Sequence, residues 1–314
     1  MSAALLALAL LAPPDSGWIA GPDGVRLYYE KLGSGPRTII VPGRLFLARE
    51  LAPLAERHTL ILYDMRNRGR SSRVEDGRLI TIQKDVEDLD AVRRHFRVDR
   101  FVPIGYSYLG LMVVLYAMEH PDRVERLVQL GPVPRKFGTE YPASLLHQDS
   151  SPVVSPAAAA RLDSLERAGW MTQHPREFCE ESRINAVRLV GDPAKAARLP
   201  NQCDMPNEWP VNLQRHFEYH FAGVQRLEVP KEAVARVKVP VLTIHGTWDR
   251  NAPYAGGREW ALTLPDARLI TVEGAAHQVA TDAPGVLLPA IDEFVSGRWP
   301  ARAEKITTLE RSPR

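Results

Sequence analysis

Hydrophobic and polar positions along the chain follow two alternating patterns. Short apolar runs with the length of buried strands are separated by segments whose apolar residues recur at helical spacing. The runs predict strands at residues 25–30, 38–41, 59–63, 101–104 and 124–130. The segments with helical spacing predict helices at residues 47–57, 85–96 and 109–119. Because a strand followed by a helix is repeated, the pattern favours an α/β fold with a mostly parallel, doubly wound sheet.

The alternation stops at Gly131-Pro132 and resumes near residue 238. The segment between is rich in proline and alanine, and its spacing predicts helices at 156–169, 175–190 and 211–223 but no strand. Beyond it, the pattern predicts strands at 239–244 and 267–272 and helices at 256–264 and 284–294. We therefore predict a leader at 1–17, a core of residues 18–131 and 238–298, an inserted helical unit at 132–237 and a loosely held polar tail at 299–314.

The leader bears on where the protein is located. Its apolar run from Ser2 to Ala12 is too short to span a bilayer but has the length of a signal-peptide apolar region. No Lys or Arg precedes this run, so a hydrophobic segment packed on the domain is the alternative. We expect export, periplasmic or secreted, with a cytoplasmic location as the alternative, and no stable membrane span. The cysteines Cys179 and Cys203 lack metal-site spacing and could form one disulfide in an exported protein.

Composition and charge exclude several classes of function. The chain has 40 basic and 38 acidic residues, a formal net charge of +2 and no basic block, so nucleic acid is not an expected partner. There is no glycine-rich phosphate loop and no dinucleotide fingerprint, and we expect no cofactor. A small molecule or a peptide remains the expected ligand, and the oligomeric state is not predicted.

A serine stands where a buried strand turns directly into a buried helix, in the stretch FVPIGYSYLGLMVVL at residues 101–115. A sharp turn of this kind presents Ser107 at a helix N-terminus, where unpaired N–H groups favour developing negative charge. A serine nucleophile needs a base and a group that orients the base. Since open α/β sheets place their sites at the carboxyl ends of strands, both should follow later strands. The alternative is that Ser107 is only an N-cap.

Both partners are present at the expected places. The strand predicted at 239–244 runs into HGTWD, which ends at Asp249, and the strand at 267–272 runs into EGAAH, which ends at His277. The order Ser107, Asp249, His277 is that of the α/β-hydrolases. GYSYLG resembles their nucleophile elbow, GTWDRNAP their acid turn and GAAHQV their histidine turn. HPDRVERLVQLGP and YDMRNRGRSS are also similar to stretches of this superfamily, and the resemblance covers residues 18–135 and 236–297.

The resemblance implies a sheet of the α/β-hydrolase type with an inserted helical cap, and it assigns roles. Ser107 would be the nucleophile, His277 the base and Asp249 the acid, although Asp249 could also be a turn former. The backbone N–H of Tyr108 is one expected oxyanion donor. The loop at 41–45 corresponds to the His-Gly loop of the family, so the N–H of Arg44 is the expected second donor, with Leu45 as the fallback.

Three positions depart from the family pattern. Leu109 stands where the family has a small residue, which could shift the elbow. Pro42 replaces the histidine before the loop glycine, and Asn67 stands where a glycine is usual. None of the three supplies a reacting atom, so they bear on geometry and subclass.

The inserted segment offers candidate substrate contacts. Glu218, in FEYHF, is similar to a cap acid that holds the free amine in proline iminopeptidases, whose Gly-Gly-Pro-Gly oxyanion loop is absent here. A solvated helix face is the alternative for Glu218. The aromatic residues expected to line the cavity, unless they pack the cap itself, are Trp170, Trp209, Tyr219 and Phe221. His216 and His220 have a spacing that could hold zinc, but no third ligand accompanies them, so we expect ring packing or a substrate contact and no metal.

Three functions follow from these residues. We expect a serine hydrolase that cleaves a small ester or amide through an acyl-enzyme. The alternative within this class is an aminopeptidase similar to the proline iminopeptidases. The alternative of another class is a non-catalytic, hydrolase-like receptor or interaction protein.

Overall fold

The computed structural model describes residues 15–146, 154–167, 175–201, 204 and 210–310. Its centre is an eight-stranded sheet with the order β1-β2-β4-β3-β5-β6-β7-β8. β1 and β2 pair with antiparallel neighbours, and the pairs from β4 to β8 are parallel. The strands are β1 Asp15–Ala20, β2 Arg26–Leu32, β3 Thr38–Pro42, β4 Thr59–Tyr63, β5 Val102–Tyr106, β6 Leu127–Leu130, β7 Val241–Gly246 and β8 Ala267–Val272.

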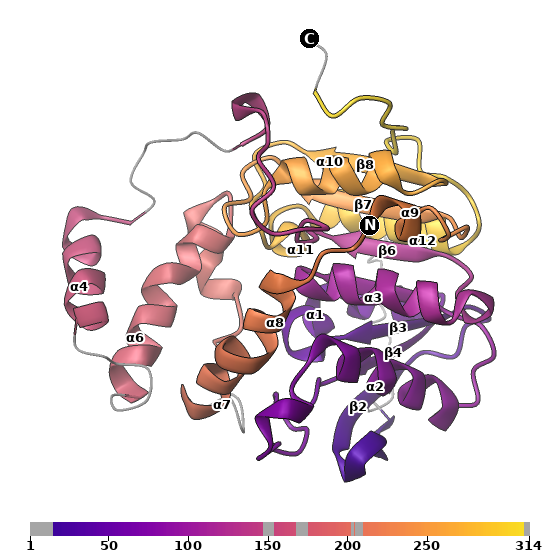
Figure 1. Cartoon of the computed structure of the whole chain (residues 1–314), viewed down its shortest axis with the longest axis horizontal. Coiled ribbons are helices and arrows are strands. Elements are labelled where there is room, and N and C mark those ends of the chain that lie inside the picture. The colour runs from indigo at the N-terminus through magenta and orange to yellow at the C-terminus, as the bar shows by residue number, and fades with distance from the viewer. Residues whose placement is uncertain (1–14, 147–153, 168–174, 202–203, 205–209, 311–314) are drawn as a thin grey trace, which may run out of the picture.

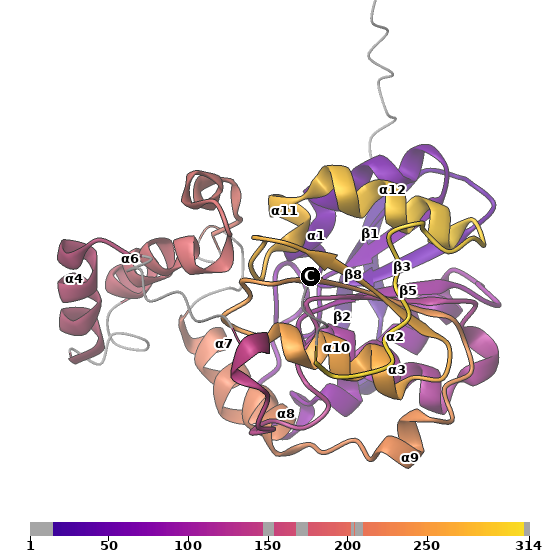
Figure 2. The same cartoon turned by 90° about the horizontal axis from the view of Figure 1, so that it is seen from above.

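Helices cover both faces of this sheet (Figures 1 and 2). One layer contains α2 Ile82–His95, α3 Tyr108–Glu119 and α10 Tyr254–Thr263. The other contains α1 Arg44–Leu51, α11 Val279–Asp282 and α12 Pro284–Val295. Alternate residues of β3 pack against opposite helix layers. Ile40 packs with α2 and α3, whereas Ile39 and Val41 pack with α1 and α12. Burial on both faces is why these strands are continuous apolar runs. The predicted α/β class and doubly wound sheet are confirmed.

The segment predicted as an inserted helical unit lies beside the sheet, with α4 and α6 farthest from it (Figure 1). Its helices are α4 Pro156–Arg167, α6 Pro175–Asn185, α7 Pro210–Arg215, a π-helix at His216–Phe221, α8 Ala222–Arg226 and α9 Lys231–Val234. Among its described residues, the β-contact recorded is an isolated bridge between Lys136 and Glu228. The division into core and cap stays a prediction.

Several element boundaries differ from the predicted ones for local reasons. The helix predicted at 47–57 begins at Arg44 and ends at Leu51, and a 3₁₀ turn that contains Pro53 follows, because proline lacks the N–H that a helix needs. β1 begins at Asp15, so residues 15–17 pair with β2 instead of belonging to a leader. Residues 1–14 of the predicted leader lie outside the described residues.

The segment after residue 298 is held more firmly than we expected. Ala303 and Ile306 are buried, and Glu304 exchanges backbone hydrogen bonds with Leu269 of β8. The Arg258 side chain also donates to the carbonyl oxygens of residues 308–310. The expectation of a loose tail is therefore wrong up to residue 310, because two apolar side chains and a strand edge give the segment something to pack on.

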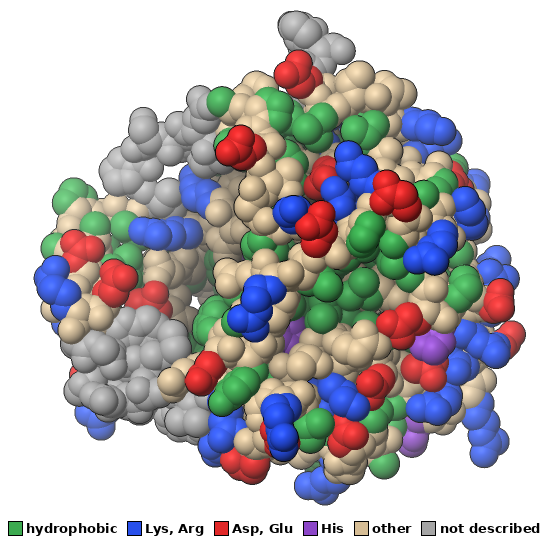
Figure 3. Space-filling view, in the orientation of Figure 1, with side chains coloured by type: hydrophobic (Ala, Val, Ile, Leu, Met, Phe, Trp, Pro, Cys, Tyr) green, Lys and Arg blue, Asp and Glu red, His purple; other side chains and the backbone are tan. Residues whose placement is uncertain are grey.

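The surface charge and the helix lengths bear on the expected partners and on the expected lack of a membrane span. On the face shown in Figure 3, acidic and basic side chains are interspersed without a field of one sign. Within the described residues, no helix is both long and apolar enough to cross a bilayer. Cys179 of α6 is disulfide-bonded, and Cys203 lies outside the described residues.

Candidate active site

Three side chains that are far apart in the chain meet at the carboxyl ends of adjacent parallel strands. Ser107 follows β5, Asp249 follows β7 and His277 follows β8. The Ser107 Oγ lies 3.0 Å from His277 Nε2, and His277 Nδ1 lies 2.8 Å from Asp249 Oδ2. The structure thus brings together the three residues that the sequence singled out, in a continuous line of hydrogen bonds.

The backbone at Ser107 has an unusual conformation that only a tight turn produces. Its φ is 58° and its ψ is −127°; Ser107 occupies the N-cap position of α3, but its side chain makes no capping hydrogen bond. The turn needs glycine on both sides. A Cβ at Gly105 would lie 2.1 Å from the Leu109 carbonyl oxygen, and one at Gly110 would lie 2.9 Å from Pro132. Backbone strain concentrated at one partly buried serine is typical of a functional turn.

Leu109 fits this turn without displacing the hydroxyl. Its side chain extends towards Gly43, where an added Cβ would lie 2.8 Å from Leu109 Cδ1, and it lines the cavity in front of Ser107. Gly43 has a positive φ of 79° and precedes α1. The Leu109 side chain therefore fits because Gly43, in the loop opposite, has no side chain of its own.

Asp249 is buried among hydrogen-bond donors that keep it ionised. Its Oδ1 accepts the backbone N–H groups of Asn251 and Ala252 at 2.9 and 2.8 Å. Burial acts to raise the pKa of Asp249, but the attraction of His277 and the hydrogen bonds from His245 and His277 outweigh it, and the pKa is lowered. Because an ionised carboxylate only accepts, His277 carries its proton on Nδ1, and its Nε2 is free to accept from Ser107.

His245 is the second imidazole on the same carboxylate. Its Nε2 lies 3.1 Å from Asp249 Oδ2 and 2.9 Å from the Ala252 carbonyl oxygen, so it donates to both. It is fully buried at the end of β7. His245 is therefore a packed, hydrogen-bonded residue that helps to hold Asp249 through the same carboxylate oxygen that His277 contacts.

The two expected oxyanion donors lie at the starts of helices. Tyr108 is the first residue of α3 and Arg44 is the first residue of α1. The Arg44 side chain is not directed at a substrate: it donates to Asp64 at 3.0 and 3.2 Å and to Glu30 at 3.1 Å. The contribution of the Tyr108 and Arg44 N–H groups, or of Leu45 in place of Arg44, stays a prediction.

A cavity of about 350 Å³ opens in front of Ser107 and His277. Its polar residues outside the hydrogen-bonded line include Arg68, His216, Asn251 and Gln278. The larger part of its surface is apolar and comes from Phe46, Leu109, Val133, Leu213, Phe217 and Phe221. Such a cavity suits a small, largely apolar ligand.

Two of the expected substrate contacts are wrong. Glu218 and Tyr219 are exposed, neither lines the cavity, and the Tyr219 ring lies over Gly77. Phe221 lines the cavity as expected, and its neighbours on the same π-helix, His216 and Phe217, line it in place of Glu218 and Tyr219. The motif similarity specified a segment but not which side of the helix faces inward. Trp170 and Trp209 lie outside the described residues.

Asn67 shows how a departure from the family pattern is accommodated. Its φ of 62° is the left-handed conformation that glycine adopts readily and asparagine tolerates. Its Oδ1 accepts the backbone N–H of Val74 and holds the loop together. The next residue, Arg68, lines the cavity, and sequence reasoning missed it because nothing in YDMRNRGRSS distinguishes a cavity arginine from a surface one.

The described residues contain no group of three or more His, Cys, Asp and Glu side chains that could hold a metal. His216 and His220 stack on each other at 4.8 Å between ring centroids, and His220 Nε2 lies 2.6 Å from Asp85 Oδ2. The pair is therefore engaged in ring packing and a carboxylate contact.

Comparisons with known proteins agree with this fold. A family model described as the alpha/beta hydrolase fold matches residues 43–162, and one described as TAP-like protein matches residues 218–305. A bifunctional esterase/perhydrolase of Acinetobacter calcoaceticus is 24% identical over 84% of this chain and 94% of its own length. A probable proline iminopeptidase of Streptomyces coelicolor is 24% identical over 91% of this chain and 97% of its own length.

Solved structures give the same result. The esterase RhEst1 from Rhodococcus superposes with a TM-score of 0.69 at 21% identity and covers 90% of this chain and 98% of its own. A meta-cleavage product hydrolase from Pseudomonas fluorescens superposes with a TM-score of 0.70 at 17% identity and covers 89% of this chain and 97% of its own. With the sheet order, the family models and these relatives together, the chain belongs to the α/β-hydrolase superfamily and is a hydrolase.

Proposed function

We propose that the protein is a serine hydrolase that cleaves a small ester or amide through an acyl-enzyme on Ser107. The observation that carries the proposal is the line of hydrogen bonds from Ser107 Oγ through His277 to Asp249, which opens into a largely apolar cavity. A hydroxyl, an imidazole and a buried carboxylate in this order are the parts that nucleophilic acyl transfer needs.

The proposed reaction has two halves. In the first, Ser107 Oγ attacks the carbonyl carbon while His277 Nε2 takes the hydroxyl proton. As the tetrahedral intermediate collapses, His277 returns that proton to the leaving alcohol or amine. In the second, water attacks the acyl group, His277 takes a proton from the water, and Ser107 is released with its own proton restored. Asp249 holds the His277 ring in the required tautomer and stabilises the imidazolium that forms.

The negative charge of the tetrahedral intermediate requires donors that are already in place. The backbone N–H of Tyr108, at the start of α3, is adjacent to the nucleophile and is the first of them. The N–H of Arg44, or that of Leu45, is proposed as the second. Removing one such donor from a serine hydrolase typically costs about 3 kcal/mol of transition-state stabilisation.

An ester is the preferred substrate class over a peptide with a free amine. Several relatives are named proline iminopeptidases, which supports the alternative. Against it, Glu218, the residue proposed to hold the amine, is exposed and outside the cavity lining. The Glu218→Gln variant separates the two: we expect no change, whereas loss of cleavage of aminoacyl amides with retained ester cleavage would favour the aminopeptidase.

A fluorophosphonate probe tests the nucleophile directly. We expect the wild type to be labelled, the Ser107→Ala variant to be unlabelled, and a matched Ser296→Ala variant, at the end of α12, to be labelled like the wild type. A wild-type protein that is folded but unlabelled would contradict the proposal and favour the non-catalytic receptor. Labelling of Ser107→Ala at the wild-type rate would place the nucleophile elsewhere.

A further inference from the structure

His216 is a buried imidazole in the wall of the cavity that the proposed reaction does not use. Only 8% of its surface is exposed, and it lines the cavity together with Ser107 and His277. Its recorded contacts are with rings: Tyr108 at 5.5 Å, His220 at 4.8 Å, Phe217 at 5.7 Å and Phe221 at 6.5 Å. Among the described residues, no hydrogen bond to either ring nitrogen of His216 is found.

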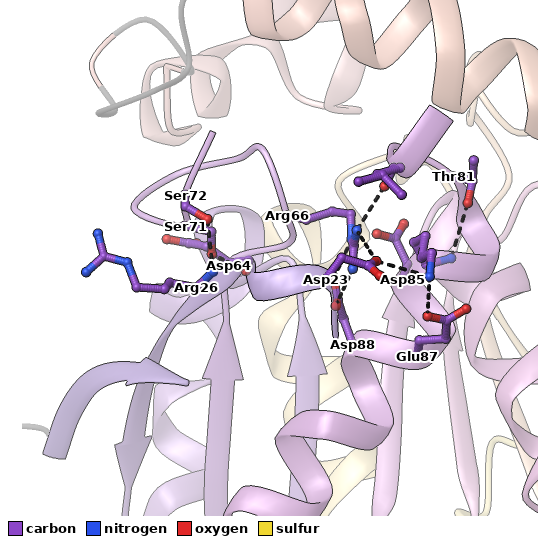
Figure 4. Close-up of polar contacts among 12 residues, drawn as sticks. Asp23, Arg26, Asp64, Arg66, Ser71, Ser72, Thr81, Asp85, Glu87 and Asp88 are labelled. Carbon is purple, nitrogen blue, oxygen red and sulfur yellow. Dashed lines mark hydrogen bonds and ion pairs between the residues drawn. The ribbon is translucent and has the colours of Figure 1, made fainter. Parts of the chain in front are cut away.

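The side chains behind His216 fix its position. His220 stacks on it with an interplanar angle of 18°, and His220 Nε2 lies 2.6 Å from Asp85 Oδ2. Asp85 is in the first turn of α2, next to Asp88 (Figure 4). Asp88 in turn accepts two hydrogen bonds from Arg66, at 2.7 and 2.8 Å. His216 therefore rests on a buried polar cluster that is anchored in the core, so its ring has little freedom to turn away.

His216 is the first residue of the π-helix, and the wider turn of this helix sets the direction of its ring. In a π-helix, hydrogen bonds join residues five apart, and here the Ala222 N–H donates to the Phe217 carbonyl. The wider turn brings both the fourth and the fifth residue onward close to His216, since His220 and Phe221 both stack on its ring, with interplanar angles of 18° and 30°. Both rings line the cavity. Widened turns of this kind are frequent at functional sites.

The surroundings of His216 keep its imidazole in the neutral form. Burial, followed by the nearby charges of Arg68 and His220, lowers the pKa of His216 well below its ordinary value. A neutral imidazole has one N–H donor and one acceptor nitrogen, and it can bind a hydroxyl or carbonyl group of an uncharged ligand. Because His216 lines the cavity, a ligand that hydrogen-bonds to its ring is favoured over one that excludes water from the ring without replacing that hydrogen bond.

We propose that His216 is a substrate-binding residue that selects esters whose apolar portion carries an uncharged hydroxyl group. The role of His216 in choosing a substrate rests on the proposed ester hydrolysis. Its preference in binding does not, because binding can be measured without turnover. The apolar portion lies against Phe46, Phe217 and Phe221, and the hydroxyl oxygen reaches the His216 ring. An otherwise identical ester without the hydroxyl leaves the ring unpaired.

The test measures binding in a background that cannot form the acyl-enzyme. Methyl phenylacetate and its 3-hydroxy and 4-hydroxy derivatives are titrated into Ser107→Ala by calorimetry. We expect at least one hydroxy ester to bind about tenfold or more tightly than the parent ester. Adding His216→Phe should reduce this ratio to below about twofold, while His216→Gln, which keeps a hydrogen-bonding group, should retain part of it. Tyr219→Phe, on the same helix but outside the cavity, should retain all of it.

The outcomes separate the two proposals. Equal binding of all three esters, no binding of any of them, or a preference that survives His216→Phe in a variant with wild-type thermal unfolding would overturn the role of His216. If the preference follows His216 but the wild type hydrolyses none of the esters, the proposed function fails and the binding role stands. Hydrolysis with the same dependence on His216 in kcat/KM supports both.

Discussion

Replacing Asp249 by asparagine tests the hydrogen-bond pattern of the site most severely. The two carboxylate oxygens accept four donors: Oδ1 accepts two backbone N–H groups, and Oδ2 accepts His277 Nδ1 and His245 Nε2. Asparagine offers one accepting oxygen and one donating NH₂ group. The backbone N–H groups cannot change their role, so the oxygen must stay with them and the NH₂ group must face the two imidazoles.

That arrangement reverses the tautomer of His277. Its Nδ1 must become an acceptor, so the ring proton moves to Nε2, which then faces Ser107 and cannot take the hydroxyl proton. The corresponding change in another serine hydrolase lowers kcat by about 10⁴, which is about 5 kcal/mol of activation free energy. We expect Asp249→Asn to lose activity by a factor of this order, with kcat for p-nitrophenyl acetate as the assay.

The loss of kcat in Asp249→Asn is compared with the thermal stability of that variant and with the kcat of a control variant. Circular dichroism and thermal unfolding should show that Asp249→Asn keeps its fold, since the volume of the side chain is unchanged. Asp122→Asn, an exposed residue outside the site, should keep wild-type kcat. A folded Asp249→Asn variant that loses less than about tenfold would refute the assignment of the acid, because that loss is far below the effect of a wrong tautomer.

Three further predictions follow from the same structure. Gly105→Ala should lower the free energy of unfolding in urea by about 3 kcal/mol, because its Cβ would lie 2.1 Å from a backbone oxygen; a change below about 1 kcal/mol contradicts this packing. The pKa of His216 is depressed in the folded protein, so the unfolded protein takes up a proton at this residue first as the pH falls below about 6.5. The free energy of unfolding of the wild type should therefore fall by up to about 2 kcal/mol between pH 7 and pH 5 relative to that of His216→Phe. The same pH dependence of the free energy of unfolding in both proteins would refute this prediction. Cys179 should react with iodoacetamide, as followed by intact mass, only after reduction, and alkylation of the unreduced protein would show that it is not disulfide-bonded.

The meeting of the three proposed catalytic side chains could be predicted from the sequence because the position of each depends on a local pattern. Ser107, Asp249 and His277 each follow a buried apolar run, and the parallel order of β5, β7 and β8 places the ends of these runs at one edge of the sheet. The direct passage from a buried strand into a buried helix indicates a sharp turn at Ser107, which its φ of 58° bears out. Local pattern and sheet topology together were enough to bring the three side chains together.

The cavity wall could not be predicted because it depends on the rotation of a helix. Apolar and aromatic residues occur on several sides of the segment 210–226, and a π-turn changes the period on which any helical projection relies. Glu218 was therefore expected inside and is exposed. The last segment was misjudged for a related reason: its two buried side chains, Ala303 and Ile306, are too few to form a pattern.

The acyl-enzyme on Ser107 is tested most directly by trapping the acyl group. The wild type and Ser107→Ala are mixed with p-nitrophenyl acetate, quenched in acid within the burst phase, digested and analysed by mass spectrometry. We expect one acetyl group on Ser107 of the wild type and none on the same peptide of the variant. Turnover by the wild type with the acetyl group on another residue, or with no covalent acetyl group during a burst of p-nitrophenol release, would contradict it.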